Sequence, residues 1–270
     1  MVTYLGKTAL VTGASAGIGA TFARILAERG MNLILVARSQ SKLQTLATEL
    51  ASRYERAVEV IPYDLSQEGA ARHIKEVICQ RHLQVDLLIN NAGFGTYGPF
   101  ETLNPEREHE EIMLNVVALA DLTRTFIPTM VERGSGAIVN VASTAAHQPV
   151  PYMAVYGATK AFVLSFSEAL WAEYQDRGIR VLAICPGATD TNFHTIAQEP
   201  SVGRMNTPEQ VVLTALKALE QGRSSVIPGL SNALMSGLLP RIFPRELTAR
   251  IVKRMMQPRP ALPERGQLPG

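Results

Sequence analysis

The sequence predicts one doubly wound α/β domain, in which a parallel sheet of about seven strands carries helices on both faces. Three observations support this fold class. Short aliphatic runs alternate with longer segments of helical periodicity. The runs are apolar throughout instead of alternating with polar residues, which is typical of strands buried on both faces. Glycine and proline clusters lie between a predicted strand and the helix that follows it, so they indicate loops.

The predicted strands are separated by six stretches long enough for helices, and this alternation favours a parallel sheet. The strands are expected at residues 8–11, 33–36, 58–61, 87–89, 137–141, 181–184 and 225–227. Loops near residues 93–99, 186–187 and 200–208 then connect strands to helices. Folds of this class bind ligands at such loops, outside the carboxyl ends of the strands.

A chain of 270 residues with 46% apolar composition can bury enough surface for one large domain. We expect this domain to span residues 1–228. A helical C-terminal extension, expected in the same domain, should span residues 229–257. Residues 258–270 are rich in proline, glycine and polar side chains and are expected to be a disordered tail.

The C-terminal extension has an amphipathic pattern and a basic charge. Apolar residues recur at helical spacing between 231 and 256, and Pro240 and Pro244 are expected to break the helices. Six basic residues between 241 and 259 oppose Glu246 alone. We interpret the extension as a cap over a substrate pocket or as a subunit contact. The alternative is a peripheral helix lying on an anionic membrane surface.

Composition argues against several classes of function. A net charge of +2 provides no general field for nucleic acid, and the five histidines lack metal-ligand spacing, so neither a nucleic-acid partner nor a metal is expected. Cys79 and Cys185 lie far apart in apolar runs, which favours buried free thiols and a cytoplasmic setting. Residues 1–6 lack a signal-peptide pattern, and no apolar stretch reaches membrane-spanning length, so no transmembrane segment is expected.

A glycine-rich turn, Thr12-Gly-Ala-Ser-Ala-Gly-Ile-Gly19, follows the first predicted strand and opens a helical segment. Without Cβ atoms, Gly13, Gly17 and Gly19 let the backbone approach a pyrophosphate closely. The amides at the start of the following helix can receive the phosphate oxygens. In this βαβ context the turn predicts a Rossmann-type dinucleotide site.

The end of the second predicted strand indicates which dinucleotide binds. Proteins that bind NAD usually offer Asp or Glu to the ribose hydroxyls at this point. This chain has Arg38 instead. A guanidinium makes paired, charged hydrogen bonds to a 2′-phosphate, so NADP(H) is predicted over NAD(H). The alternative is an arginine exposed at a strand end.

Tyr156 is followed four residues later by Lys160, and Ser143 stands thirteen residues upstream of the tyrosine. On a helix, the four-residue spacing places the ammonium beside the phenol. A nearby cation favours phenolate, which a tyrosine acid/base requires near neutral pH. Taken alone, such a pair is more often two neighbours on a solvated helix face, so the catalytic interpretation depends on the rest of the chain.

The rest of the chain resembles the short-chain dehydrogenase/reductase family over about residues 7–228. The resemblance is carried by several motifs in the family's order. These are the Thr12 to Gly19 turn, Asn90-Asn91-Ala92-Gly93, Asn115, Ser143, Tyr156-x-x-x-Lys160 and Pro186-Gly187-x-x-x-Thr191. Ala16 departs from many NADP-preferring members, which have Lys or Arg there, so Arg38 is left as the main candidate for the 2′-phosphate.

The resemblance implies specific roles for these residues. Tyr156 would be the general acid/base, Lys160 would also bind the nicotinamide ribose, and Asn115 would complete a water-linked proton relay to Lys160. Ser143 would complete the catalytic set. Asp64 would meet the adenine amino group. The cofactor-binding residues implied are Gly13, Ser15, Gly17, Ile18, Gly19, Arg38, Asp64, Leu65, Asn91, Ala92, Gly93, Tyr156, Lys160, Pro186, Gly187, Thr189 and Thr191.

The resemblance implies an NADP(H)-dependent enzyme that interconverts a carbonyl and an alcohol, and a homodimer or homotetramer joined through long helices near 106–131 and 152–175. An apolar ketone, aldehyde or 3-oxoacyl compound would suit a pocket with an apolar and aromatic wall. A catalytically silent, NADP-sensing interaction protein is the alternative. The candidates for the wall are Phe94, Tyr97, His147, Tyr152, Met153 and Phe193.

Overall fold

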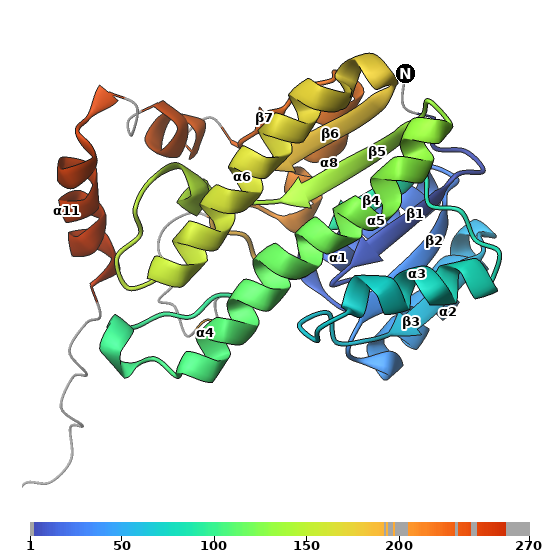
Figure 1. Ribbon diagram of the computed structural model, residues 1–270, viewed down its shortest axis with the longest axis horizontal. Helices are drawn as coiled ribbons and strands as arrows, with labels where there is room; N and C mark the ends of the chain where they lie inside the picture. Colours follow the sequence, from blue (N-terminus) through green and yellow to red (C-terminus); the bar gives the residue numbers. More distant parts are fainter. Residues whose placement is uncertain are drawn as a thin grey trace, which may run out of the picture.

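The computed structural model describes residues 3–191, 193, 197, 205–229, 232–238 and 242–257. Its centre is a seven-stranded sheet in the order β3-β2-β1-β4-β5-β6-β7, with every neighbouring pair parallel (Figure 1). The strands are β1 (Thr8–Thr12), β2 (Asn32–Ala37), β3 (Val58–Pro62), β4 (Leu87–Asn90), β5 (Gly136–Val141), β6 (Ile179–Ile184) and β7 (Ser225–Val226). All seven predicted strands are confirmed to within two residues at each end.

Helices cover both faces of the sheet, as predicted for a doubly wound fold. One face carries α1 (Gly17–Glu28), α2 (Gln40–Tyr54) and α8 (Pro208–Glu220), and the other carries α3 (Ala70–Gln80), α5 (Leu119–Glu132) and α6 (Ala154–Tyr174). Successive residues of β1 enter opposite cores: Ala9 and Val11 pack on the first face and Leu10 on the second. Burial on both faces explains why the strands read as unbroken apolar runs.

The sheet reverses its direction of growth between β1 and β4, which are neighbours in space but not in sequence. Helices that follow β1 and β4 leave the sheet on opposite faces, so a crevice opens at the carboxyl ends of these strands. The loops after β1, β2, β4, β5 and β6 all converge there. The strand order alone therefore places the ligand site at this edge of the sheet.

Local sequence signals account for several helix starts. Asn104 accepts a hydrogen bond from the amide of Arg107 (2.9 Å) ahead of α4 (Pro105–Ile112), which has proline at its first position. Thr207 and Gln210 form a reciprocal capping box at the start of α8. Short 3₁₀ segments complete the connections: Phe100–Thr102, Thr144–His147 and Gln175–Arg177.

One long helical run leads from the site to the far end of the sheet. It starts with α4, passes through a π-helical segment at Met113–Ala118 and continues as α5 to Glu132. Within the described residues this run, Pro105–Glu132, is long and apolar enough to cross a membrane by length and composition, although no such stretch was expected from the sequence. It packs against α3, α6 and β5, and 39% of its most apolar stretch is buried, so this packing accounts for part of its apolar composition.

The structure corrects the expectation for one of the two cysteines. Cys185 is buried beyond β6, as predicted, but Cys79 is exposed. On α3 the buried positions include Ile74 and Ile78, so the next residue after Ile78 turns outward by about 100°. The apolar run around Cys79 belongs to an amphipathic helix and not to a buried strand.

The C-terminal extension contains a π-helical segment at Ala233–Leu238 and a helix, α11 (Arg245–Met256). Helix α11 begins directly after Pro244, as the sequence predicted. Pro240 and the expected disorder of residues 258–270 lie outside the described residues. Figure 1 shows α11 at the edge of the molecule, next to the loops at the carboxyl ends of the strands.

Candidate active site

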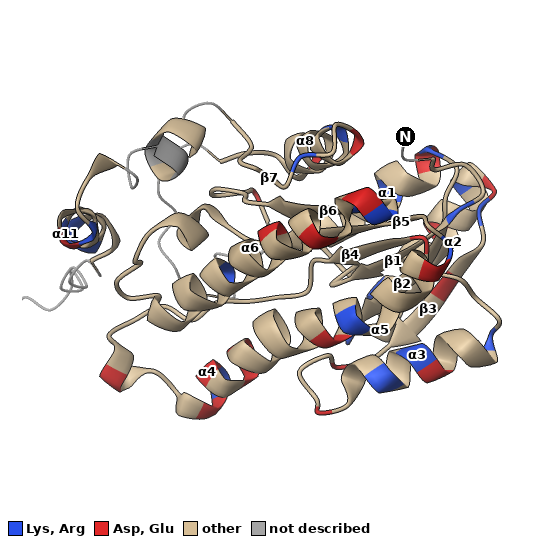
Figure 2. Ribbon diagram, turned by 45° about the horizontal axis from the view of Figure 1, so that its top comes forward, with Lys and Arg blue, Asp and Glu red and all other residues tan. Residues whose placement is uncertain are grey.

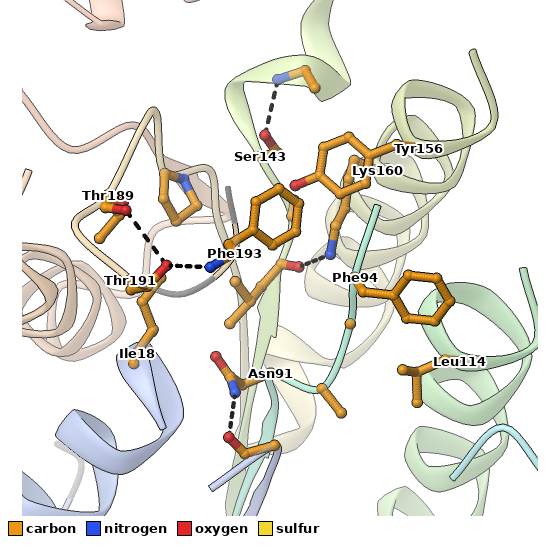
Figure 3. Close-up of a pocket in the computed structure, with 18 of the residues that line it drawn as sticks. Ile18, Asn91, Phe94, Leu114, Ser143, Tyr156, Lys160, Thr189, Thr191 and Phe193 are labelled. Carbon is orange, nitrogen blue, oxygen red and sulfur yellow. Dashed lines mark hydrogen bonds between the residues drawn. The ribbon is translucent and has the colours of Figure 1, made fainter. Parts of the chain in front are cut away.

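A cavity of about 600 Å³ lies at the carboxyl edge of the sheet and runs from the glycine-rich turn to helix α11. Figure 3 shows its central part, with Ser143, Tyr156 and Lys160 projecting from the loop after β5 and from α6. Of the predicted site residues, only Gly19 and Asn115 are missing from the wall. The structure therefore brings together side chains that are up to about 180 residues apart in the sequence.

The glycine-rich turn is closely packed against the loop that follows β4. Gly13 has φ +64°, and a Cβ there would stand 2.7 Å from Nδ2 of Asn91. Gly17 has φ +54°, and its Cβ would stand 3.0 Å from the Thr191 side chain. A Cβ on Gly19 would collide with the Gly13 carbonyl oxygen, so Gly19 allows the close packing of α1 and does not line the cavity.

This turn fits the pyrophosphate of a dinucleotide. Helix α1 begins at Gly17, and no side chain caps its N-terminus. The first amides of a helix have no partner within the helix, and they carry partial positive charge. Gly17 and Ile18, the first residues of this helix, line the cavity, and Gly13 and Gly17 bring no Cβ atoms into it. An anion can therefore approach the amides closely.

Thr12 fixes the glycine-rich turn to the loop after β4. Its hydroxyl donates to the Ile89 carbonyl (3.2 Å) and accepts from the amides of Asn91 (2.9 Å) and Ala92 (3.0 Å). The Asn91 side chain donates back to the Thr12 carbonyl at 2.9 Å. Both loops therefore keep their relative position by hydrogen bonds to one buried hydroxyl.

Arg38 and Asp64 lie at the end of the cavity that is furthest from α11. The Arg38 side chain is 69% exposed and stands 3.9 Å from Asp64 Oδ2. Asp64 Oδ1 accepts hydrogen bonds from the amide and hydroxyl of Ser66, at 3.0 and 2.8 Å. Lys42, in the first turn of α2 and four residues after Arg38, also lines this end, and sequence reasoning missed it. Two cations here suit a phosphate on the ribose.

Tyr156 and Lys160 are both buried on α6, which rules out the solvated helix face as the explanation of their spacing. Lys160 Nζ donates to the Val141 carbonyl (2.9 Å) and lies 5.7 Å from the centre of the Tyr156 ring. Burial lowers the pKa of Lys160 to about 8, an effect that the negative charge of Glu111 opposes. Ser143 is buried beyond β5, and its hydroxyl accepts from the Ala145 amide (3.1 Å).

Asn115 lies in the π-helical segment, behind the wall of the cavity. Its Oδ1 accepts from the Phe94 amide (3.2 Å), and its Nδ2 donates to the Phe94 carbonyl (2.8 Å) and to Thr159 Oγ1 (3.1 Å). A Cβ on Gly93 would stand 2.8 Å from Asn115 Oδ1 and 3.4 Å from Lys160 Nζ. Because Gly93 has no Cβ, Asn115 Oδ1 and Lys160 Nζ can both lie beside its Cα.

The loop after β6 closes the cavity opposite α6. Thr189 donates to the Gly187 carbonyl (2.9 Å), and Thr191 donates to the Thr189 carbonyl (3.4 Å) and accepts from the Phe193 amide (3.3 Å). The Pro186 carbonyl accepts from the Thr144 amide (2.9 Å), which joins this loop to the one that carries Ser143. These bonds place the loop's polar atoms along the middle of the cavity.

The α11 end of the cavity is apolar, and the structure confirms half of the predicted wall. Phe94, Met153 and Phe193 line it, and the Phe193 ring lies 5.3 Å from that of Tyr156. Tyr97, His147 and Tyr152 do not line it. The Tyr97 hydroxyl donates instead to the Met256 carbonyl (2.6 Å), which fixes the end of α11. The wall residues that sequence reasoning missed are Arg107, Leu114, Ala145, Gln148, Val150, Val252, Met255 and Met256.

Arg107 is the missed residue with the most distinctive surroundings. Its guanidinium lies 3.6 Å from the centre of the Phe94 ring and donates to Glu110 Oε2 at 2.8 Å. Stacking on an aromatic face orients a guanidinium and leaves its remaining N–H groups free to bind. Arg107 therefore places a cation at the edge of the apolar end of the cavity.

The comparisons with known proteins agree with this geometry. A family model described as short chain dehydrogenase matches residues 7–200. The chain is 34% identical over 230 residues to the very-long-chain 3-oxoacyl-CoA reductase of Bos taurus, and the alignment covers 83% of this chain and 72% of the relative.

Two solved structures share the fold across nearly the whole chain. A short-chain dehydrogenase from Sphingobium yanoikuyae in complex with NADPH is 33% identical, with a TM-score of 0.80 and coverage of 96% of this chain and 99% of that one. The bulky-bulky ketone specific alcohol dehydrogenase from Comamonas testosteroni is 33% identical, with a TM-score of 0.76 and coverage of 97% and 99%. The chain belongs to the short-chain dehydrogenase family.

Proposed function

We propose that this short-chain dehydrogenase interconverts a carbonyl and an alcohol, with NADP(H) as its cofactor and Tyr156 as its general acid/base. The observation that carries the proposal is the burial of Tyr156 and Lys160 side by side in one cavity with Ser143. The same cavity has the glycine-rich turn, which presents backbone without Cβ atoms, at one end and an apolar wall at the other. A dinucleotide and an apolar substrate would meet at the tyrosine.

The chain's own residues would hold the cofactor along the length of the cavity. The amides at the start of α1 would bind the pyrophosphate, and Arg38 would bind the 2′-phosphate with help from Lys42. Ile18, Leu65 and Ala92 line the intervening part of the wall. That the Sphingobium relative binds NADPH supports this choice of cofactor.

The proposed chemistry places polar groups around one substrate oxygen. When bound, the nicotinamide supplies or accepts the hydride. In reduction, Ser143 and Tyr156 donate hydrogen bonds to the carbonyl oxygen, and the phenol passes its proton to the forming alkoxide. The Lys160 ammonium stabilises the phenolate that remains. Donors already aimed at the point where negative charge develops are usually the largest contribution to catalysis.

The proposed substrate is a ketone, aldehyde or 3-oxoacyl compound with an apolar body. Phe94, Val150, Met153, Phe193 and Val252 supply a wall that excludes water from such a group. Arg107 at the edge would bind an anionic part of the substrate, as a 3-oxoacyl thioester of coenzyme A provides. The names of the relatives, a 3-oxoacyl-CoA reductase and a bulky-ketone dehydrogenase, support the same chemical range.

The test is a screen of NADPH oxidation against 3-oxoacyl thioesters, bulky ketones, steroids and aldehydes. We expect turnover of at least one class and a loss of about 10²- to 10⁴-fold in kcat for Tyr156→Phe, which removes only the hydroxyl that transfers the proton. Tyr174→Phe is the matched control, because Tyr174 lies at the far end of the same helix. A folded Tyr156→Phe protein with parental turnover would refute the mechanism. NADPH binding without turnover of any class would favour the silent, NADP-sensing protein.

We propose that two copies pair through the long helices. Phe162 and Phe166 stack at 5.6 Å on α6, and Phe162 is exposed; Ile112 is also exposed in the run that starts with α4. Large apolar side chains on two adjacent helices suit a homodimer contact or part of a homotetramer. Light scattering after size exclusion should give a mass of at least twice 29.4 kDa, and Phe162→Glu should reduce it.

We further propose that α11 lies against an anionic membrane surface. Leu247 and Ile251 lie four residues apart and are 43% and 48% exposed, and Met255, which also borders the cavity, is 56% exposed. Arg250 and Arg254 follow the same outward side of the helix, and Figure 2 shows basic residues on α11 at the edge of the molecule. A second α11 placed against this face would bring like charges together, whereas anionic lipid complements it.

Sedimentation with vesicles tests this contact. Vesicles with anionic phosphatidylglycerol should retain the protein at low salt, and neutral phosphatidylcholine vesicles should retain much less. Leu247→Ser with Ile251→Ser should abolish retention. Leu213→Ser, at an exposed leucine of α8, is the control that should leave retention unchanged. No retention on anionic vesicles would remove the proposal.

A further inference from the structure

Glu111 is a fully buried carboxyl group that the mechanism above does not use. Its side chain is 0% exposed, on α4, one helical turn before Asn115. Oε2 accepts a hydrogen bond from the Thr96 hydroxyl at 2.9 Å. Oε1 is buried and has no hydrogen-bond partner among the described residues. Burial of an incompletely satisfied carboxylate is unfavourable unless an opposite charge compensates for it.

The loop after β4 contacts both the helix that carries Glu111 and the catalytic lysine. Asn115 binds the backbone of Phe94, and Glu111 binds Thr96, so two successive turns of one helix hold the loop that contains Gly93. A Cβ on Gly93 would stand 2.8 Å from Asn115 Oδ1 and 3.4 Å from Lys160 Nζ, so the space beside Gly93 holds both polar atoms. Helices α4 and α6 pack together, and Glu111 does not line the cavity. Glu111 is therefore near enough to act on the charge of Lys160 from outside the cavity wall.

Few charges face this region among the described residues. Those that act on Glu111 are Lys160, which favours its ionisation, and Glu108, which opposes it. Those that act on Lys160 are Glu111 and the Cys185 thiol. Burial raises the pKa of Glu111 to about 7 and that of Cys185 to about 12, so near neutral pH the thiol is uncharged. Glu111 is the carboxylate that can balance the ammonium.

We propose that Glu111 is a positioning residue whose buried carboxylate keeps Lys160 in its charged form. The inference rests on the proposed function for its catalytic meaning, because Lys160 in turn stabilises the Tyr156 phenolate. Glu111 does not line the cavity that would hold cofactor and substrate, so it acts through Lys160.

The proposal predicts the direction in which the pKa of Lys160 changes when Glu111 is replaced. Burial favours the neutral amine of Lys160, and a carboxylate behind it favours the ammonium. Loss of the carboxylate should therefore lower the pKa of Lys160 further. Above that lower pKa the phenolate of Tyr156 loses its cation, and proton transfer becomes harder. The loss should be largest above pH 7, where Glu111 is ionised, and smallest at pH 6.

Lysine NMR measures this coupling directly. The chain has six lysines, so protein labelled with ¹³C at lysine Cε gives six titrating signals, and Lys160→Arg identifies the one to follow. In Glu111→Gln, which keeps the shape of the side chain, the pKa of Lys160 should fall by about one unit. Glu111→Asp restores the charge and should bring the pKa back toward the parent value. A purely structural role predicts no such recovery.

Glu108→Gln is the matched control. Glu108 is on the same helix, is also buried and also has a buried Oε1 without a hydrogen-bond partner among the described residues. It acts on Glu111 but not on Lys160. Its replacement should leave the pKa of Lys160 no lower than in the parent. An equal fall in both Gln variants would overturn the specific role of Glu111, as would an unchanged pKa in Glu111→Gln.

A reciprocal titration covers the case in which Glu111→Gln does not fold. Coupling is mutual, so Lys160→Met should raise the pKa of Glu111, followed by ¹³C at glutamate Cδ. An unchanged value would contradict the proposal. Both titrations use the free protein without substrate, so they stand apart from the turnover of Tyr156→Phe. With an active substrate, kcat/KM of Glu111→Gln should fall up to about tenfold relative to the parent at pH 8.5 and little at pH 6.

Discussion

The two ends of the cavity are built from different parts of the chain. The end near Arg38 is formed by turns that directly follow strands, and its shape depends on backbone at Gly13 and Gly17. The end near α11 is formed by side chains such as Met153 and Val252, from loops and from the C-terminal extension. We call the end near Arg38 the backbone-built end and the end near α11 the side-chain-built end. Substitutions at the backbone-built end disturb the main chain and are poorly tolerated, whereas substitutions at the side-chain-built end can change which ligand binds without changing the fold.

The largest effect should come from adding one methyl group at the backbone-built end. In Gly19→Ala the Cβ meets the Gly13 carbonyl, so we expect unfolding free energy to fall by about 3 kcal/mol and NADPH binding to be lost. Gly157→Ala is the control, because its Cβ would have only ordinary contacts at 3.4 Å. Urea denaturation and fluorescence titration measure both quantities. Equal urea midpoints for Gly19→Ala and Gly157→Ala would contradict this prediction, because they would show that the turn can move to accommodate the methyl group.

Charge reversal at the same end should change cofactor preference. Arg38→Asp removes a charged hydrogen bond to the 2′-phosphate and adds repulsion, so the ratio of NADPH to NADH affinity should fall by about 100-fold. Arg53→Asp, an exposed residue of α2 outside the cavity, should leave the ratio unchanged. Calorimetric titration with both cofactors gives the ratio. An unchanged ratio in Arg38→Asp would assign the preference to another residue.

Between the two ends, Glu111 should make stability depend on pH. Its pKa is raised from 4.5 to about 7 in the folded protein, so between these values the folded state binds more protons than the unfolded state. Stability from this group is fully present below pH 4.5 and is lost as pH rises through about 7. Relative to Glu111→Gln, the parent should lose about 3 kcal/mol over this range. Denaturation curves with parallel pH dependence in both proteins would contradict this.

The smallest effect is expected at the side-chain-built end. Val252→Ala shortens a buried wall residue of α11, so KM for an apolar substrate should rise by about tenfold or less, with NADPH affinity unchanged. Leu247→Ala, on the exposed side of the same helix, should change neither quantity. A change in NADPH affinity with Val252→Ala would show that the two ends are coupled.

Much of the fold was predictable because buried parallel strands and glycine turns leave strong local signals. Thr8–Thr12 is a largely apolar run that is typical of a buried strand. The turn after it requires glycine because a Cβ at Gly13 or Gly19 would clash with neighbouring atoms. The placement of Ser143, Tyr156 and Lys160 in one cavity followed from motif order. The structure confirmed that placement by their common burial.

The features that were missed depend on packing between distant segments. Nothing local distinguishes Arg107 or Glu111 from neighbouring charged residues of α4, where Glu106 and Glu110 are solvated. Only the loop after β4, which brings Phe94 and Thr96 against this helix, gives them a special environment. A signal was present for Val252, because the apolar spacing of the extension marks an inward face.

The π-helical segment at Met113–Ala118 has a consequence for insertions and deletions. A π turn holds one residue more than an α turn, so deletion of a single residue there would restore a regular helix. Because a π turn and an α turn each complete one revolution, the helix on the N-terminal side would keep its orientation relative to α5. Glu111 and Arg107 would still face Thr96 and the Phe94 ring. The extra residue in this turn thus widens the helix beside the Phe94 backbone, where Asn115 binds, without turning the flanking helices away from their partners.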